Sequence, residues 1–319
     1  MEKKISIIIP TYKRGHIVKT VIDSILCSTY QNFEILVIEQ RGNDTLQKFI
    51  DTYHKPDVIF FYNVSFIGAS RAKNFGIKKA NGKIIAFTDD DCVVDKNWLF
   101  IISQLFETQK DIVGCNGEVF PFMSTLHDNE FCPSTFTSNS PCIIKNPCLH
   151  SKYIGFGNNM ALKRNVLLEN KGYKTWLGPG SLGQAAEDAE LSLRLIIKGY
   201  KLIYNPKSIV YHNKWLTEQE MKNLELSYLC GELACYGYYF LSGYSFAQKV
   251  IKDNVVDSFY DMKRIFGDIF KRKTIRTNDW KYSVMKLITR MKGFFIGLFY
   301  YLKEVVFRIK DESILINKL

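Results

Sequence analysis

The sequence of 319 residues has no pair of cysteines in a CxxC arrangement and no apolar run long enough to cross a bilayer. Its eight cysteines lie in a chain large enough to fold without disulfide staples, so we expect reduced thiols that mostly pack in the interior. No secretory signal is visible, because Met1 to Lys4 runs directly into a short strand-like segment. These absences argue against a disulfide-rich secreted protein, and we expect the chain to stay in the cytoplasm.

Negative charge is also scarce, since 32 Asp and Glu residues oppose 43 Lys and Arg residues and leave a formal net charge of +11. Such a surplus implies anionic partners, for example nucleotide phosphates, an anionic membrane surface or nucleic acid. No helix-turn-helix, zinc-finger or RNA-binding signature is present, so we expect no nucleic acid. The length favours one large domain with an appendage, or two domains.

Apolar β-branched runs alternate with segments of helical periodicity through the first 90 residues. This alternation predicts a parallel sheet with right-handed crossovers, and therefore an α/β fold. Residues 111–119 predict a further strand pair, and 120–153, with little periodicity, predict a long loop or a covering lid. The expected early strands are Ile5–Ile9, Glu34–Glu39, Val58–Tyr62 and Ile84–Phe87.

Three consecutive carboxylates, Asp89, Asp90 and Asp91, follow the apolar strand Ile84–Phe87. Open α/β sheets bind ligands at the carboxyl ends of their strands. Alternate side chains of an extended segment point the same way, so Asp89 and Asp91 can face one site while Asp90 faces the other side. Oxygen ligands of this kind suit Mg²⁺ or Mn²⁺, which bind through one or two carboxylates plus substrate phosphates. The alternative is a solvated acidic turn.

A second acidic pair, Glu187 and Asp188, precedes apolar residues that recur at helical spacing. The pair is therefore expected in the first turn of a helix, where the helix dipole favours negative charge. Taken alone, this pattern favours ordinary capping electrostatics over a catalytic role.

Several segments together resemble a family 2 glycosyltransferase with the GT-A fold. The resemblance implies a Rossmann-like, mixed and mostly parallel sheet flanked by helices, with an α-helical extension at the carboxyl end. The segments that carry it are Ile7–Arg14 for the opening strand and nucleotide loop, Ala72–Ile77 for the Ala-Arg-Asn-x-Gly-Ile helix with Lys73 where Arg is usual, Phe87–Cys92 for the Asp-x-Asp motif, Gly155–Leu162 for the Gly-Gly-Asn-Met-Ala segment, and the long pattern from Glu187 to His212.

The resemblance implies an inverting transferase that moves a sugar from a nucleotide-diphosphate donor, expected to be UDP-linked, to a hydroxyl of a glycan or lipid-linked acceptor. Asp188 would be the catalytic base and Glu187 its positioning partner, with a divalent cation, Mn²⁺ or Mg²⁺, on the leaving diphosphate. By resemblance the metal ligands are Asp91, Asp89 and His212, and the donor contacts are Pro10, Thr11, Tyr12, Arg14, Glu39, Asn74, Asp89 and Asp90.

The resemblance has departures. The family commonly has two aspartates after its second strand, but this chain has Glu39 and Gln40, so the identity of the nucleotide base is open. Glu39 could instead be a solvated strand-end acid, and His212 a plain strand-end histidine. The Gln-x-x-Arg-Trp motif of processive members is absent, which predicts one or a few sugars per encounter. A catalytically silent nucleotide-sugar or glycan-binding protein of the same fold is the alternative function.

The last hundred residues differ in character, so we expect a catalytic domain at 1–214 and a helical region at 215–319. Just before Glu187, Gly178–Gly183 predicts a mobile loop. Residues 284–310 predict a basic amphipathic helix, whose uninterrupted apolar run of ten residues is too short to span a bilayer, where about 20 are needed. This helix either packs on the catalytic domain or makes a peripheral contact with the anionic inner face of the cell membrane.

Overall fold

The computed structural model describes residues 5–42, 44–127, 129–147, 151–270 and 279–309. Among them, the residues up to Thr175 and from Glu187 to Gln219 form one compact unit, which we call the sheet unit. The residues from Trp176 to Ala186 and from Glu220 onward form a second one, the helical unit. The loop that precedes Glu187 therefore groups with the helical unit.

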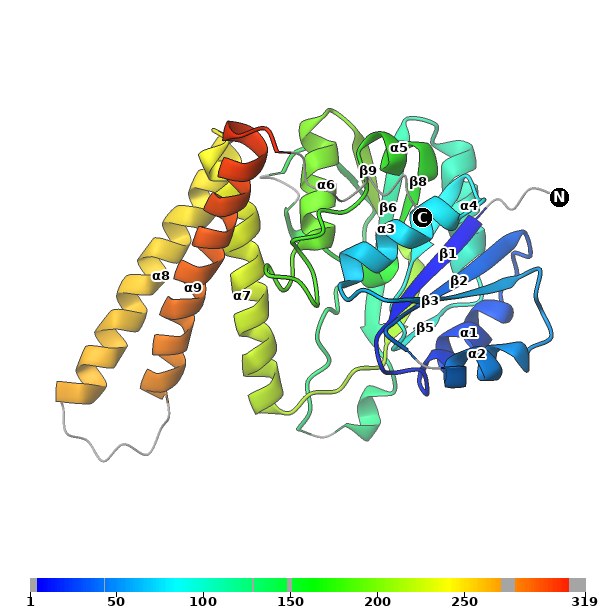
Figure 1. The fold of residues 1–319 in the computed structure, drawn as a ribbon, viewed down its shortest axis with the longest axis horizontal. Coiled ribbons are helices and arrows are strands. Elements are labelled where there is room, and N and C mark those ends of the chain that lie inside the picture. The colour runs from blue at the N-terminus through cyan, green and yellow to red at the C-terminus, as the bar shows by residue number, and fades with distance from the viewer. Residues whose placement is uncertain (1–4, 43, 128, 148–150, 271–278, 310–319) are drawn as a thin grey trace. The chain divides into compact units, whose positions relative to one another are not determined.

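The sheet unit is built on one mixed sheet in the order β3-β2-β1-β4-β8-β6-β9-β5, with β7 also paired to β9 (Figure 1). The strands β1 to β4 are parallel to one another, whereas β8 is antiparallel to both β4 and β6. The mixed sheet flanked by helices that the sequence predicts is confirmed. The strands are β1 (Ile5–Thr11), β2 (Phe33–Gln40), β3 (Ile59–Val64), β4 (Ile84–Phe87), β5 (Cys92–Val94), β6 (Ile112–Pro121), β7 (Cys142–Ile144), β8 (Met160–Lys163) and β9 (Lys201–His212).

Both faces of the sheet are covered, which explains why β1, β2 and β4 are continuous apolar runs. Alternate residues of β1, such as Ile7, pack in one core with α1, α2 and α4. On the opposite face, Gly76 of α3 lies against Ile8, where a Cβ atom would come within 2.8 Å of the isoleucine side chain. The helices of this unit are α1 (Val18–Leu26), α2 (Asp44–Asp51), α3 (Ala69–Lys79), α4 (Trp98–Thr108), α5 (Arg164–Glu169) and α6 (Glu187–Ile197).

The strand pair predicted for 111–119 is wrong, because these residues belong to the single strand β6. Its Asn116 and Gly117 do not form a turn. A Cβ atom at Gly117 would lie 2.1 Å from the carbonyl oxygen of Ser208 in β9, at a shift in the strand register. The glycine therefore serves close approach of two backbones.

The segment 120–153 is partly ordered into short elements within the sheet unit. A 3₁₀ turn, Ser124–Leu126, and the strand β7 lie in it, and isolated bridges join Val119 to Phe136 and Phe131 to Leu216. Residues 128 and 148–150 lie outside the described residues.

The helical unit contains three long helices, α7 (Glu218–Leu241), α8 (Ser245–Phe270) and α9 (Asp279–Tyr301), followed by a π-helical turn at Leu302–Val306. The helices α8 and α9 run side by side (Figure 1). The helical character expected for the end of the chain is confirmed. None of the described helices is both long enough and apolar enough to cross a membrane.

Candidate active site

The parallel strands β1, β2 and β4 end at the same edge of the sheet and deliver most of the predicted donor-binding residues there. Thr11 at the end of β1 pairs in register with Glu39 of β2, and Ile8 pairs with Phe87, the last residue of β4. The sequence pattern of strand followed by polar loop therefore brings Pro10, Thr11 and Glu39 to the edge where the acidic triplet begins.

Asp90 and Asp91 lie in a turn, not in an extended segment, and the amide of Cys92 donates to the carbonyl of Asp89 at 3.2 Å across that turn. The prediction that Asp90 faces away from Asp91 is therefore wrong. Arg14 donates to both carboxylates, at 2.5 Å to Asp90 and 2.9 Å to Asp91. The Arg14 side chain is 44% exposed, whereas both carboxylates are buried.

His212 completes this cluster from the end of β9, which pairs with β5 so that Cys92 lies opposite His212. Its Nε2 atom lies 3.2 Å from Oδ1 of Asp91. Burial alone would lower the pKa of His212, but the hydrogen bond to Asp91 and the charges of Asp91 and Asp89 raise that pKa to about 10. Burial would raise the pKa of Asp91, yet His212 and Arg14 lower it to about 2.

The other two acids of the triplet have raised pKa values. Burial raises the pKa of Asp90 to about 7 even though the charge of Arg14 opposes the shift. Burial and the charge of Asp91 raise the pKa of Asp89. The triplet therefore holds less negative charge at neutral pH than three ionised carboxylates would. A bound cation would lower the pKa values of Asp89 and Asp90 and so favour their ionised forms.

The geometry around His212 fits a divalent cation. Its Nδ1 atom lies 2.7 Å from the carbonyl oxygen of Pro133 and donates its proton to that oxygen. The other ring nitrogen, Nε2, therefore points toward Asp91. Single ligand atoms of Asp91, Cys92 and His212 all lie within 4.8 Å of one another. Burial keeps the pKa of Cys92 well above its ordinary value, so its thiol is neutral and a poor ligand. A carboxylate and an imidazole remain, which suit Mn²⁺, while Mg²⁺ would use Asp91 alone.

The second acidic pair begins α6, as predicted, and meets a buried cation. Nζ of Lys73, from α3, lies 2.8 Å from Asp188 and 3.2 Å from Glu187. Burial and the charge of Asp188 raise the pKa of Glu187 to about 7, although Lys73 opposes the shift. Burial would lower the pKa of Lys73, but the charges of Asp188 and Glu187 raise it instead.

Neighbouring residues shape the space around Asp188. A Cβ atom at Gly157 would lie 2.0 Å from a carboxylate oxygen of Asp188, so this glycine leaves room for the carboxylate. Nζ of Lys73 lies 4.9 Å from the ring centroid of Tyr173. Asn74, expected among the donor contacts, donates to the carbonyl of Tyr173 at 2.8 Å and accepts from its amide at 2.7 Å. Asn74 thus holds the backbone of Tyr173 in place next to the Lys73 side chain.

Lys73 and Tyr173 also interact with residues of the acidic triplet or near it. The charge of Lys73 acts on Asp89 as well as on Asp188 and Glu187. The ring of Tyr173 also contacts Phe87, the last residue of β4, at 5.4 Å between centroids. Sequence reasoning noticed Lys73 only as a departure from a motif and missed Tyr173. The available signal for Lys73 was its helical spacing from Gly76 and Ile77, which places it on the buried face of α3.

Glu39 is buried at the end of β2, and its Oε2 atom has no hydrogen-bond partner among the described residues. Burial raises its pKa. A Cβ atom at Gly42 would lie 1.9 Å from the Glu39 carboxyl carbon, so the glycine makes room for the acid. Gln40 accepts from the amide of Gly68 at 2.7 Å and donates to the carbonyl of Thr11 at 3.3 Å. Glu39 therefore has a carboxylate oxygen that can accept a hydrogen bond from a ligand, whereas the Gln40 side chain already joins the backbones of Thr11 and Gly68.

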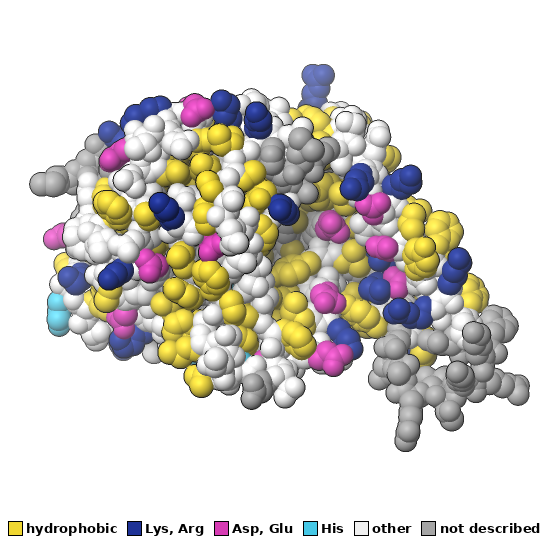
Figure 2. All heavy atoms as spheres, turned by 180° about the vertical axis from the view of Figure 1, so that it is seen from behind, with side chains coloured by type: hydrophobic (Ala, Val, Ile, Leu, Met, Phe, Trp, Pro, Cys, Tyr) yellow, Lys and Arg dark blue, Asp and Glu magenta, His cyan; other side chains and the backbone are white. Residues whose placement is uncertain are grey.

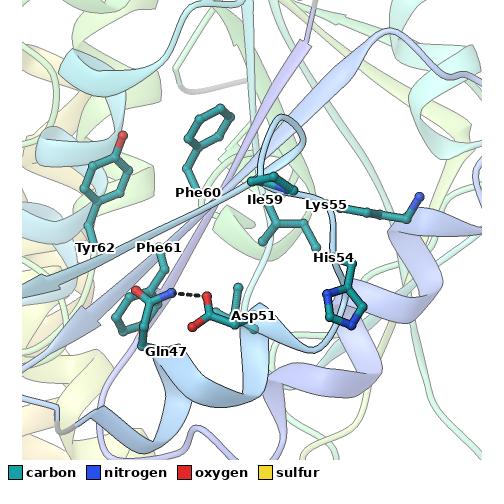
Figure 3. A pocket seen from close by; sticks show the side chains of 10 residues that line it. Gln47, Asp51, His54, Lys55, Ile59, Phe60, Phe61 and Tyr62 are labelled. Atoms are coloured by element: carbon teal, nitrogen blue, oxygen red, sulfur yellow. Dashed lines mark hydrogen bonds between the residues drawn. The ribbon is translucent and has the colours of Figure 1, made fainter.

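A separate pocket of about 410 Å³ lies between α2 and the edge strand β3 (Figure 3). Figure 3 shows Gln47 and Asp51 turned toward one another, with a hydrogen bond of 2.7 Å between them. None of the residues predicted for catalysis or donor binding lines this pocket.

Sequence comparisons place the whole site within matched segments. Residues 6–140 match glycosyl transferase family 2, and residues 84–305 match glycosyl transferase family group 2. A glucosyl-dolichyl phosphate glucuronosyltransferase of Haloferax volcanii is 26% identical over 216 residues, which are 66% of this chain and 69% of that protein. An uncharacterized glycosyltransferase of Rickettsia felis is 35% identical over 140 residues, which are 42% of this chain but 23% of that protein.

Solved structures with a similar fold cover nearly the whole chain. The mannosyltransferase PcManGT from Pyrobaculum calidifontis, in complex with GDP-Man and Mn²⁺, has a TM-score of 0.58 at 13% identity and covers 91% of this chain and 88% of its own. Residues 1–349 of S. aureus TarS have a TM-score of 0.55 at 13% identity, covering 93% and 91%. At this identity the likeness shows the fold.

Proposed function

Because this chain belongs to the family 2 glycosyltransferases, we propose that it transfers a sugar from a nucleotide-diphosphate donor to a hydroxyl of a glycan or lipid-linked acceptor, with inversion. The observation that carries the proposal is the meeting of two acidic clusters. Asp89–Asp91 and the pair of Glu187 and Asp188 come from distant parts of the sequence, and the buried Lys73 interacts with Asp89 as well as with Glu187 and Asp188.

Asp188 is the proposed catalytic base. A sugar hydroxyl is a poor nucleophile at neutral pH, so a carboxylate within hydrogen-bond reach must take its proton as the new bond forms. Asp188 is suited to this task because Gly157 makes room for its carboxylate and Lys73 fixes one of its oxygens. Glu187, bound to the same ammonium group, would hold the pair in place.

The donor diphosphate would lie at the acidic triplet. Asp91 and His212 would hold the cation, with Asp89 beside them, and a bound Mn²⁺ or Mg²⁺ would supply positive charge to the leaving diphosphate. Arg14 already contacts Asp90 and Asp91 from a half-exposed position, so its guanidinium can also reach phosphate oxygens from solvent. A base and a leaving group at separate clusters support a single displacement with inversion.

The nucleotide would lie on Pro10, Thr11 and Tyr12, with its base toward Glu39. The unpartnered Oε2 atom of Glu39 is a buried acceptor, and such atoms are rarely left without a donor. A ring N–H of uracil is a suitable donor, so we propose UDP. The similarity to the glucosyl-dolichyl phosphate glucuronosyltransferase of Haloferax volcanii supports a lipid-linked acceptor.

We place the reaction in the cytoplasm, with residues 284–310 in peripheral contact with the inner face of the cell membrane. The seven cysteines that the structure describes are free, as expected in a reducing compartment. We assign catalysis to residues 1–214 and this contact to the helical region 215–319.

The experiment that tests the proposal is thermal unfolding of the purified chain with a panel of nucleoside diphosphates and nucleotide sugars, each with Mn²⁺ and with chelator. A ligand at 100 times its dissociation constant should add about 2.7 kcal/mol if it binds only the folded state. We expect metal-dependent stabilisation by uridine nucleotides. A folded sample that responds to none of them would contradict the proposal, and donor binding without turnover on any acceptor would indicate the silent binding protein.

A further inference from the structure

The buried residues of α9 are small or polar, and they are Ser283, Arg290, Gly293 and Gly297. Gly293 and Gly297 lie against α7, where a Cβ atom would come within 2.5 Å of the carbonyl oxygens of Cys230 and Ala234. Arg290 is also buried, and it donates to Asp261 of α8 at 2.6 Å. The helix therefore packs through close backbone approach and an ion pair.

Four large apolar side chains of α9 point outward instead. Ile288, Met291, Phe295 and Phe299 recur at helical spacing, and each is between 56% and 62% exposed. We call these four residues the outer stripe. The neighbouring helix α8 has the same distribution, since Asn254 and Asp261 are buried while apolar side chains such as Phe259 are exposed. Figure 2 shows yellow hydrophobic side chains beside basic ones on the surface of the helical unit.

This distribution is the reverse of a bundle in water and resembles helices in lipid, which pack through glycines and polar contacts and keep large apolar side chains outside. The charge also suits an anionic surface. Lys281, Lys292 and Arg308 are exposed on this helix and the turn after it, whereas Glu304 is occupied by Trp176 and Tyr238. We propose that the outer stripe seats α9 in the plane of an anionic lipid bilayer, with these basic residues at the headgroups.

Co-sedimentation of the full chain with phosphatidylcholine vesicles, with and without phosphatidylglycerol, tests this inference. We expect binding to the anionic vesicles that weakens at high salt. The double variant Phe295→Gln and Phe299→Gln should bind about tenfold more weakly. The matched control replaces two exposed apolar residues of the sheet unit, Phe100→Gln and Leu168→Gln, and should bind as the parent does.

Two results would overturn the inference. One is a parent chain that stays in solution with anionic vesicles. The other is a parent that self-associates while the Phe295 and Phe299 variant does not, because the stripe would then be an interface between copies. The membrane contact would give the enzyme access to a lipid-linked acceptor, and only this purpose rests on the proposed function. Nucleotide-dependent stabilisation is measured without vesicles, so the two proposals fail separately.

An independent observation concerns the segment 176–186, which leads directly into Glu187. Trp176 stacks on Tyr300 at 4.5 Å between centroids, and its Nε1 donates to Glu304 at 3.2 Å. At the other end, Gln184 and Ala186 have φ angles of 65° and 69°, a conformation that costs residues other than glycine. Such strain persists only where the surroundings impose it, and it concentrates at functional sites.

We infer that Trp176 is a positioning residue for the segment that leads into the catalytic pair, because it ties the start of this strained segment to α9 within the helical unit. Trp176→Ala should lower kcat at least tenfold while the donor dissociation constant stays unchanged, and Trp176→Phe should restore most of kcat by keeping the stacking. Tyr238→Phe, which removes the hydrogen bond from the Tyr238 hydroxyl to Glu304 and keeps the ring, is the matched control with parent-like kcat. An unchanged kcat in Trp176→Ala, or a parallel loss of donor binding in a folded sample, would overturn the inference.

Discussion

The two acidic clusters are neutralised by cations of different accessibility. Arg14, which binds Asp90 and Asp91, is 44% exposed, and His212 on the same cluster is a titratable ring. Lys73, which binds Glu187 and Asp188, is 3% exposed. The first cluster therefore has partners that can move away or lose a proton, whereas the second has a partner locked in the core.

This difference matches what each cluster has to do. A cation site must exchange its resident partners for a metal and a diphosphate at each turnover, so movable partners are useful there. A general base must keep one orientation, and a buried ion pair holds it at the cost of desolvating the charges. The comparison leads to four predictions, from the largest effect to the smallest.

The largest effect should come from the fixed cluster. Asp188→Asn keeps the shape of the side chain but cannot accept the acceptor's proton, so transfer should fall by about 10²–10⁴. Donor binding, measured by calorimetry with Mn²⁺, should stay near that of the parent. Asp91→Asn is the matched variant at the other cluster, and it should lose metal-dependent donor binding. If both variants lose donor binding equally, the separation of roles is wrong.

Removing the locked cation should also be costly. Lys73→Met removes the buried ammonium group that binds Asp188 and Glu187, and breaking a buried pair in this way costs about 3–5 kcal/mol of unfolding free energy. Lys73→Arg keeps the charge and should retain most of the stability. The control on the same helix is Lys78→Met at an exposed position, with an expected change within about 0.5 kcal/mol. Urea unfolding measures all three, and a cost below about 1 kcal/mol for Lys73→Met would show that the pair is not locked.

The movable cluster should respond to pH. Its His212 has a pKa of about 10, so the ring is protonated at neutral pH and a metal on Nε2 must displace a proton. Affinity for Mn²⁺ should therefore rise about tenfold per pH unit between pH 7 and 9. Because the folded pKa lies above the ordinary 6.5, the metal-free protein should lose stability as pH rises from about 6.5 to 10.

The control for this titration is His212→Asn, which removes the titrating ring. Its Mn²⁺ affinity should be weaker and nearly independent of pH over the same range. A parent affinity that is flat with pH would mean that His212 is not a metal ligand, and Asp91 would then hold the cation with other partners.

The sequence predicted the parts of this site that depend on local pattern. Apolar β-branched runs located β1, β2 and β4, and polar residues after them lie at the edge of the sheet where the acidic triplet begins. It did not predict the turn that brings Asp90 beside Asp91, because that turn is held by Arg14 from another loop. The pairing of Lys73 with Asp188 spans 115 residues and leaves no periodic signal.

The helical unit shows a different limit of sequence reasoning. Helical periodicity predicted an apolar face on α9, but period alone does not say which face is inside. The inside is set by Gly293 and Gly297, whose missing side chains let the backbone of α7 approach. The face of α9 that packs on α7 is therefore the one with the small residues, not the one with the outer stripe.

The smallest effect should come from the movable cation. Arg14→Met removes an ion pair whose cationic side is half exposed, and such pairs contribute about 0–1 kcal/mol. Asp90 would not be left as an uncompensated buried charge, because its pKa is already about 7 and the carboxyl can take up a proton. Urea unfolding of Arg14→Met beside Lys73→Met compares the same replacement at the two clusters, and donor binding should weaken only in Arg14→Met. If both lose 3–5 kcal/mol, both clusters are locked, and the first could not release its partners to bind a metal and a diphosphate.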